Sequence, residues 1–229
     1  MDKKVIVISL GGSIIVPDEI DVEFLKRFKK VIEKHRKNWS FVVVCGGGSI
    51  ARKYITALRL AGKSEYLQSM NGIAVTRMNA RFMSYFFGKD ANEGIPHDME
   101  QVKTMLAKND AVFCGALRYA PKQTSDATSA KLANFFKSDF INLTVVSGLY
   151  TSNPLVNKNA KFILKISWKD FNEKTKKIHY KPGQHFVLDQ SAAEIIFKNK
   201  IKTYILGPDM KNLDDFLSGR KFKGTIIAG

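Results

Sequence analysis

The stretch SFVVVCGGGSIARKYI, residues 40–55, runs from an apolar, β-branched segment through three glycines and a serine into an amphipathic run. Its first half is typical of a buried strand, and its second half is typical of a helix that begins at the glycines. A second junction of the same kind, KVIVISLGGSIIVP, lies at residues 4–17. Two such junctions need a shared explanation, and neighbouring parallel strands that end at one edge of a sheet would supply it.

Strands and helices alternate along the whole chain. Apolar runs predict strands at residues 4–10, 40–45, 110–116, 140–146, 162–166, 201–206 and 225–227. Helical periodicity predicts helices at residues 22–36, 49–61, 65–87, 98–108, 126–137, 189–198 and 209–217. We expect the helix at 65–87 to be interrupted near Asn71 and Gly72, and residues 169–181 to form an exposed excursion. The alternation predicts an α/β fold, a three-layer α/β/α sandwich with a mainly parallel central sheet, in a single domain spanning residues 1–229.

The composition is that of an ordinary globular protein. Of the 229 residues, 45% are hydrophobic and 25% are charged. No apolar run approaches the roughly 20 residues that a membrane span needs, so we expect no membrane partner. The N-terminal MDKK leads directly into a predicted strand, so we expect no signal peptide and a cytoplasmic location. The two cysteines lack CxxC spacing and the four histidines are scattered, which argues against a disulfide framework or a structural zinc site.

The formal net charge of +16 leaves two interpretations open. Such a surplus attracts anionic partners, including nucleotides, phosphate and nucleic acid. It also arises when lysines on solvated helix faces keep a protein in solution. The lysines are spread over the whole chain without regularly spaced aromatic residues. We therefore favour the second interpretation and do not expect a nucleic-acid partner.

Glycine-rich loops at strand ends suit a phosphate group. Without side chains, backbone N–H groups can approach an anion closely, and the following helix points its N-terminal dipole at the same place. Arg52, one turn into the second helix, could bind phosphate oxygens with two donors. The alternative is a tight turn without a ligand. Neither loop matches G-x-x-x-x-G-K-[ST] or G-x-G-x-x-G, so the Walker A and Rossmann fingerprints are absent.

Two later loops are candidates for the same edge of the sheet. In QTSDATSAKLANFF, Thr124, Ser125 and Asp126 stand at a predicted helix start, where simple N-terminal capping is the competing explanation. In TVVSGLYTSNP, Tyr150 follows a Ser-Gly turn, and it could cover an adenine ring or be an ordinary surface tyrosine. Taken singly, neither loop distinguishes ligand binding from plain structure.

The order of these motifs resembles that of the amino acid kinase superfamily. The segments that carry the resemblance are ISLGGSIIVP, VVVCGGGSIARKYI, NGIAVTRMNA, TSDATSAKLANFF, SGLYTSNP, VLDQSAAEII, IKTYILG and GTII. They span essentially the whole chain, and they look most like the archaeal type of uridylate kinase. The most specific pieces are the GGGS-x-A-R run, the TR-x-N-A segment and the D-x-x-A-A-x-I-I helix.

The resemblance implies a fold, a reaction and an assembly. The fold would be an α/β sandwich around a mainly parallel sheet of about eight strands. The reaction would move the γ-phosphoryl group of ATP to UMP in pyrimidine nucleotide biosynthesis, with Mg²⁺ carried by the ATP and no protein residue assigned as a metal ligand. Such a transfer needs positioning and charge stabilisation rather than a covalent nucleophile. The assembly would be a homo-oligomer, a hexamer built as a trimer of dimers.

The resemblance also implies roles for individual residues. Arg52 and Asp126 would be catalytic, with Arg52 on the ATP phosphates and Asp126 organising the charges around the transfer. The ATP site would comprise Gly11, Gly12, Ser13, Gly48, Arg52, Thr144, Tyr150 and Asn153. The UMP site would comprise Gly46, Gly47, Ser69, Leu117, Arg118, Thr124 and Ser125.

Several positions depart from the family pattern. Ser9 stands where many members carry a lysine. Ser69, Ser147 and Asn153 stand where acidic residues are common. The loop GALRYAPKQTSD, residues 115–126, is longer than usual and gains cations. The lost carboxylates and the gained cations make the site more positive.

These departures keep three alternatives open. The acceptor could be a carboxylate, a carbamate or isopentenyl phosphate, although no histidine lies in the glycine-rich region where the last would need one. The protein could bind nucleotides without catalysis, or bind nucleic acid through its charge alone. The retained Arg52 and Asp126 favour a working nucleotide site.

Overall fold

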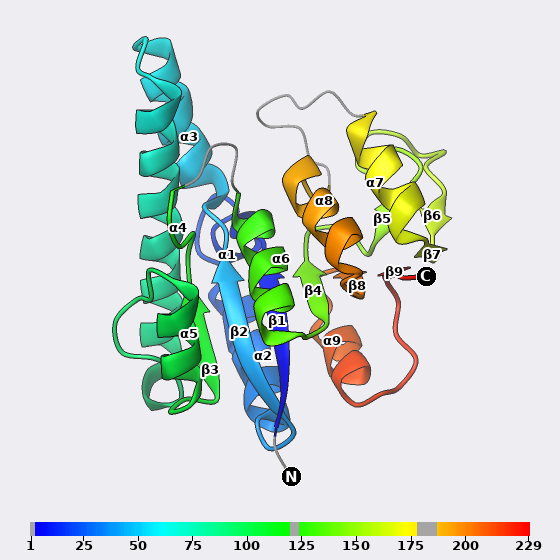
Figure 1. Ribbon diagram of the computed structural model, residues 1–229, viewed down its shortest axis with the longest axis horizontal. Coiled ribbons are helices and arrows are strands. Elements are labelled where there is room, and N and C mark those ends of the chain that lie inside the picture. The colour runs from blue at the N-terminus through cyan, green and yellow to red at the C-terminus, as the bar shows by residue number, and fades with distance from the viewer. Residues whose placement is uncertain (1–2, 120–123, 178–186) are drawn as a thin grey trace.

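The main β-sheet contains seven strands in the part of the chain that the computed structural model describes, residues 3–119, 124–177 and 187–229 (Figure 1). The strands are β1 (Lys4–Leu10), β2 (Trp39–Cys45), β3 (Ala111–Cys114), β4 (Phe140–Leu143), β7 (Lys165–Ile166), β8 (Thr203–Leu206) and β9 (Thr225–Ile227). Their order across the sheet is β3-β2-β1-β4-β8-β9-β7, and every neighbouring pair is parallel except β8 and β9. The predicted mainly parallel sheet is confirmed.

The predicted strand at residues 162–166 divides between two sheets. Its first half, β6 (Phe162–Ile163), pairs antiparallel with β5 (Leu149–Tyr150) in a separate two-stranded ribbon. Its second half, β7, joins the edge of the main sheet beside β9. Between them the Leu164 carbonyl accepts a hydrogen bond from the Ile226 N–H at 2.9 Å. The chain therefore changes sheets at one residue, and the ribbon is held against the end of the main sheet.

Both faces of the main sheet are buried, because successive strand residues point to opposite sides. Ile6, Ile8 and Leu10 of β1 belong to one core, and Val7 belongs to the other. The first core is covered by α2 (Val22–His35), α4 (Glu65–Phe87) and α9 (Met210–Leu217). The second is covered by α5 (Met99–Leu106), α6 (Ser125–Phe136), α7 (Trp168–Lys176) and α8 (Gln190–Asn199). The predicted three-layer α/β/α sandwich is confirmed.

Helix α4 runs unbroken through Asn71 and Gly72, so the predicted interruption there is wrong. Gly72 faces α3 (Gly48–Leu60), where a Cβ added to this glycine would lie 3.2 Å from the Ile55 Cδ1 atom. The missing side chain lets the two helices approach closely instead of ending one of them. Figure 1 shows α3 and α4 lying side by side. Within the described ranges, no helix is long and apolar enough to cross a bilayer.

The exposed excursion predicted at residues 169–181 is wrong for its first eight residues. Helix α7 covers Trp168–Lys176, and Phe171 on it is fully buried in the second core. The lysines mask the pattern in the sequence because they stand between the few buried residues of the helix, which packs against α8. Residues 178–181 lie outside the described part of the chain.

The strands β3, β2, β1 and β4 end next to one another at one edge of the sheet, because they are parallel neighbours. Leu10, the last residue of β1, is in register with Cys45 of β2 and Leu143 of β4. The Gly11 N–H donates to the Leu143 carbonyl at 3.1 Å, and the Gly46 N–H donates to the Leu10 carbonyl at 2.9 Å. The four candidate loops of the sequence therefore leave the sheet side by side.

Candidate active site

The two glycine loops interlock backbone against backbone. A Cβ on Gly12 would lie 2.0 Å from the Gly48 nitrogen, and a Cβ on Gly46 would lie 2.5 Å from the Gly12 nitrogen. Gly48 also has a φ of +64°, in the left-handed region that favours glycine. Helix α1 (Gly12–Ile15) starts at the first loop and α3 starts at the second. The two junctions in the sequence thus share one explanation, which is mutual packing that admits no side chain.

Helix α4 holds these loops in place through the TR-x-N-A segment. The Asn79 Nδ2 group donates to the Gly46 carbonyl at 2.7 Å. The Thr76 hydroxyl oxygen accepts from the Ala116 N–H at 2.9 Å. The Arg77 Nε group donates to the Ala116 carbonyl at 3.0 Å, and its Nη2 group donates to the Leu117 carbonyl. One helix therefore fixes both the second glycine loop and the loop that follows β3.

Arg52 connects the two glycine loops from one turn inside α3. Its Nη1 group donates to the Ser13 hydroxyl at 3.2 Å, and its side chain is otherwise exposed. A guanidinium here lies beside the N-terminal ends of two helices, where backbone N–H groups are free to bind an anion. The arrangement concentrates hydrogen-bond donors and positive charge at one point of the sheet edge.

Two carboxylates meet beside the end of β1, at the N-terminal ends of α6 and α8. The buried Ser9 hydroxyl donates to Asp126 Oδ1 at 2.7 Å. The Thr124 hydroxyl donates to Asp189 Oδ2. Thr124 also caps α6 by accepting from the Ala127 N–H at 3.1 Å, and Asp189 caps α8. The capping explanation therefore holds for Thr124, while the Asp126 side chain is turned toward Ser9.

The electrostatics of this cluster are unusual for a carboxyl group. Burial, as the larger cause, and the nearby Asp189 carboxylate together raise the pKa of Asp126 to about 7, although the hydrogen bond from Ser9 lowers it. A carboxyl group with a raised pKa at the edge of a ligand site is a candidate functional group. Sequence reasoning missed Asp189 as a site residue, although the D-x-x-A-A-x-I-I helix that it caps was recognised as a specific motif.

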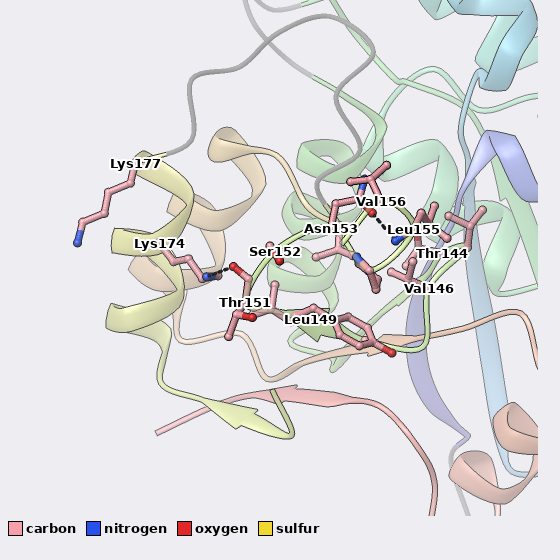
Figure 2. A pocket seen from close by; sticks show the side chains of 15 residues that line it. Thr144, Val146, Leu149, Thr151, Ser152, Asn153, Leu155, Val156, Lys174 and Lys177 are labelled. Carbon is pink, nitrogen blue, oxygen red and sulfur yellow. Dashed lines mark hydrogen bonds between the residues drawn. The ribbon is translucent and has the colours of Figure 1, made fainter. Parts of the chain in front are cut away.

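A cavity of about 540 Å³ opens beside the first glycine loop (Figure 2). Thr144, Tyr150 and Asn153, three of the residues expected in the ATP site, all line it. Thr144 directly follows Leu143, whose carbonyl binds Gly11, so the cavity adjoins the glycine loops. Tyr150 packs edge-on against Phe162, with ring centroids 5.2 Å apart, and forms part of the wall.

The residues expected to bind the acceptor differ in how directly the structure places them at the candidate site. Gly46 and Gly47 lie in the interlocked loop, Thr124 caps α6, and Ser125 is the first residue of α6. Three others are placed less directly, namely Ser69, Leu117 and Arg118. Ser69 lies two turns from Thr76 on α4 and is half-buried. The Leu117 side chain is buried in the second core, so only its backbone could reach a ligand. The Arg118 side chain is 79% exposed and donates to Asp98 Oδ2 at 3.1 Å.

Two further observations concern clusters of metal-ligating side chains and the two cysteines. The described residues contain no group of three or more His, Cys, Asp or Glu side chains that could hold a metal ion. Cys45 and Cys114 are free and fully buried, and burial raises the pKa of both thiols, to about 12 for Cys114. Both thiols are therefore core residues without reactivity.

A parallel sheet with glycine loops and helix N-termini gathered at the carboxyl ends of its strands defines an α/β protein that binds phosphate-bearing ligands. Comparison with known proteins narrows this class, because residues 4–207 match the amino acid kinase family. The chain belongs to the amino acid kinase family.

Individual relatives match over almost their full length. The uridylate kinase of Thermococcus onnurineus is 33% identical over 224 residues, covering 97% of this chain and 98% of its own. That of Pyrococcus abyssi is 35% identical over 225 residues, with the same coverage. The crystal structure of uridylate kinase from Archaeoglobus fulgidus superposes with a TM-score of 0.84 at 34% identity, covering 97% of this chain and 99% of that one. The UMP kinase of Ureaplasma parvum, at 22% identity and a TM-score of 0.82, shares the fold.

Proposed function

We propose that this protein is a uridylate kinase, which transfers the γ-phosphoryl group of ATP to UMP and releases ADP and UDP for pyrimidine nucleotide synthesis. The observation that carries the proposal is the meeting of the interlocked glycine loops with the Asp126–Asp189 pair at one edge of the sheet. The full-length similarity to uridylate kinases supports the same acceptor.

The two substrates would approach the glycine loops from opposite sides. ATP occupies the cavity, with its base near Tyr150 and its phosphates running past Thr144 to Gly11, Gly12 and Ser13. The contact between Gly11 and Leu143 supports this path, because it joins the cavity wall to the first glycine loop. UMP binds toward Gly46 and Gly47 and the loop that follows β3, which α4 anchors.

The chemistry follows from this placement. A phosphate oxygen of UMP attacks the γ-phosphorus of ATP, and the bond from that phosphorus to the bridging oxygen of ADP breaks. Charge spreads over the equatorial oxygens of the transferred group, and the loop N–H groups and Arg52 stabilise it. Because these donors are fixed by the fold, little reorganisation is needed during the transfer. Asp126 and Asp189 supply negative charge, and this charge keeps the cations of the site in position.

Mg²⁺ is the metal that we propose to accompany ATP. The oxygens of Asp126 and Asp189 are hard donors of the kind that Mg²⁺ prefers, and the two carboxyl groups lie near enough to interact. Two carboxylates are too few to form a complete cage, so the phosphates and water would complete the shell. When bound, the ion neutralises charge on the β- and γ-phosphates.

Two of the departures from the family pattern are compatible with activity. Ser9 replaces a lysine, and its hydroxyl holds Asp126 in position at 2.7 Å. Asn153 replaces an acidic residue, and its Oδ1 atom accepts from the Leu155 N–H at 3.0 Å. An aspartate would accept the same hydrogen bond, so the turn at Asn153 does not require a negative charge at this position.

We further propose that residues 1–229 form one domain and assemble as a hexamer, a trimer of dimers, in the cytoplasm. The continuous seven-stranded sheet supports one domain. Helix α4 supports association, because Leu67, Met78 and Tyr85 lie exposed on it at intervals of whole helical turns. The molar mass from light scattering checks the hexamer, and a monomer at working concentration would contradict it.

Replacing Arg52 with alanine should lower kcat about 100-fold or more, because a fixed cation is removed from developing phosphate charge. The measurement is ADP release with saturating ATP and UMP. Arg59→Ala, on the last turn of the same helix, is the matched control for loss of one exposed arginine and should retain wild-type turnover. Near-normal turnover of the Arg52 variant would remove this residue from the site.

A further inference from the structure

Two exposed aliphatic side chains stand at the mouth of the cavity. Leu155 is 64% exposed and Val156 is 82% exposed, yet both line the cavity. Val145, also exposed, lines it too. Single exposed aliphatic residues are ordinary, but a group of them on the rim of a cavity indicates a surface that a ligand covers.

The turn that carries Leu155 and Val156 is built rigidly. The Asn153 side chain accepts from the Leu155 N–H at 3.0 Å, and its carbonyl accepts from the Val156 and Asn157 N–H groups at 3.3 and 3.0 Å. The Asn157 Nδ2 group donates to the Ser152 hydroxyl at 2.9 Å. At the base of the turn, β5 and β6 pair as a ribbon. The two side chains are thus held outward by hydrogen bonds on both sides.

The lining of the cavity indicates which part of a ligand Leu155 and Val156 would contact. Its lining includes three further aliphatic side chains, those of Val146, Leu149 and Val187. Figure 2 shows Lys174 entering from α7, across the cavity from Leu155 and Val156, with its Nζ atom 3.4 Å from the Thr151 carbonyl. A nucleoside triphosphate has only one part with broad apolar faces, which is its base. The ribose and the phosphates are polar throughout.

We propose that Leu155 and Val156 form an apolar lip that binds the donor nucleotide through the face of its base. The inference rests on the proposed function in one respect, which is that the donor is a nucleoside triphosphate. The lip is a determinant of donor affinity that lies apart from the glycine loops. The fixed turn lowers the ordering cost of binding, because the two side chains are already in position. The lip contributes to holding ATP and takes no part in the transfer.

The test is the double variant Leu155→Ser/Val156→Ser, with Leu164→Ser as its matched control. Leu164 is also 64% exposed, but it lies between β6 and β7 and does not line the cavity. The double variant should raise the Kd for Mg-ATP in calorimetry, and the KM for ATP, about tenfold, because apolar contact area with the base is lost. The KM for UMP and kcat should stay within twofold, and Leu164→Ser should match the wild type.

Inorganic tripolyphosphate separates the base from the phosphates, because it carries the phosphate chain alone. Its Kd should be the same for the wild type and the double variant. An unchanged Kd for ATP would overturn the proposal, as would an equal loss for ATP and tripolyphosphate, which would mean damage to the phosphate site. If the wild type binds ATP but phosphorylates no UMP, the proposed function fails while the calorimetric comparison still tests the lip.

Discussion

Replacing Gly12 with alanine should destabilise the folded protein by about 4 kcal/mol or more, which is a large fraction of the stability of a domain. The added Cβ would lie 2.0 Å from the Gly48 nitrogen and 2.6 Å from the Gly46 carbonyl carbon. Both neighbours are backbone atoms of a loop that α4 holds through Asn79, so they cannot move aside cheaply. The measurement is the free energy of unfolding in urea.

Gly62→Ala is the matched control for this variant. Gly62 has a φ of +67°, but its added Cβ would meet no atom within 4 Å. Its cost should therefore be limited to backbone strain, about 1–3 kcal/mol. If Gly12→Ala and Gly62→Ala lose the same stability, the two glycine loops are not packed as described. If they differ as expected, the interlocking of the loops is the reason for both glycine junctions.

Replacing Asp126 with asparagine should lower kcat about 100-fold or more while the protein remains folded. The amide oxygen can still accept the hydrogen bond from Ser9, so shape is kept and only the charge is lost. Fixed charges that position a phosphoryl group contribute effects of about this size. ADP release measures turnover, and Glu33→Gln on α2 controls for the loss of one carboxylate elsewhere. A folded variant with wild-type turnover would show that Asp126 has no part in the transfer.

The same variant has a pH signature that separates charge from packing. Because the folded protein raises the pKa of Asp126 from 3.8 to about 7, the folded state binds this proton more tightly than the unfolded chain does. Its contribution to stability is present in full below about pH 4 and is lost as the pH rises toward 7. Asparagine does not titrate. The melting temperature of Asp126→Asn minus that of the wild type should therefore grow from pH 4 to pH 7 and stay constant above. A flat difference would contradict the buried placement of this carboxyl group.

The parallel sheet and its two cores were predictable, because strands buried on both faces read as unbroken apolar runs. The continuity of the long helix α4 and the presence of the short lysine-rich helix α7 were not. At Gly72 the sequence shows a residue that often ends a helix, whereas here its missing side chain admits Ile55 of α3. In α7, the buried ring of Phe171 anchors a helix that is otherwise rich in lysine. Such a helix has too few apolar residues to show helical periodicity in the sequence.

The site was predictable where chemistry is local and less so where it depends on contacts between distant segments. Arg52 follows the glycines by one helical turn, so its approach to the phosphate loops could be expected. Asp189 could not be placed in the same way, because its meeting with Thr124 joins residues 65 positions apart. An aspartate at a helix start looks like a cap in the sequence, and Asp189 is a cap as well as a neighbour of Asp126. Only the packing of α6 beside α8 adds the second role.

The most direct test of the proposed function is ADP release by the purified protein with Mg-ATP against a panel of acceptors. The panel comprises UMP, CMP, dUMP, AMP, GMP, carbamate, glutamate and isopentenyl phosphate. A uridylate kinase predicts a kcat/KM for UMP at least tenfold above that for every other member, which corresponds to a difference of about 1.4 kcal/mol in transition-state binding. Another acceptor that matches or exceeds UMP, or no ADP release from a protein that binds ATP in calorimetry, would contradict it.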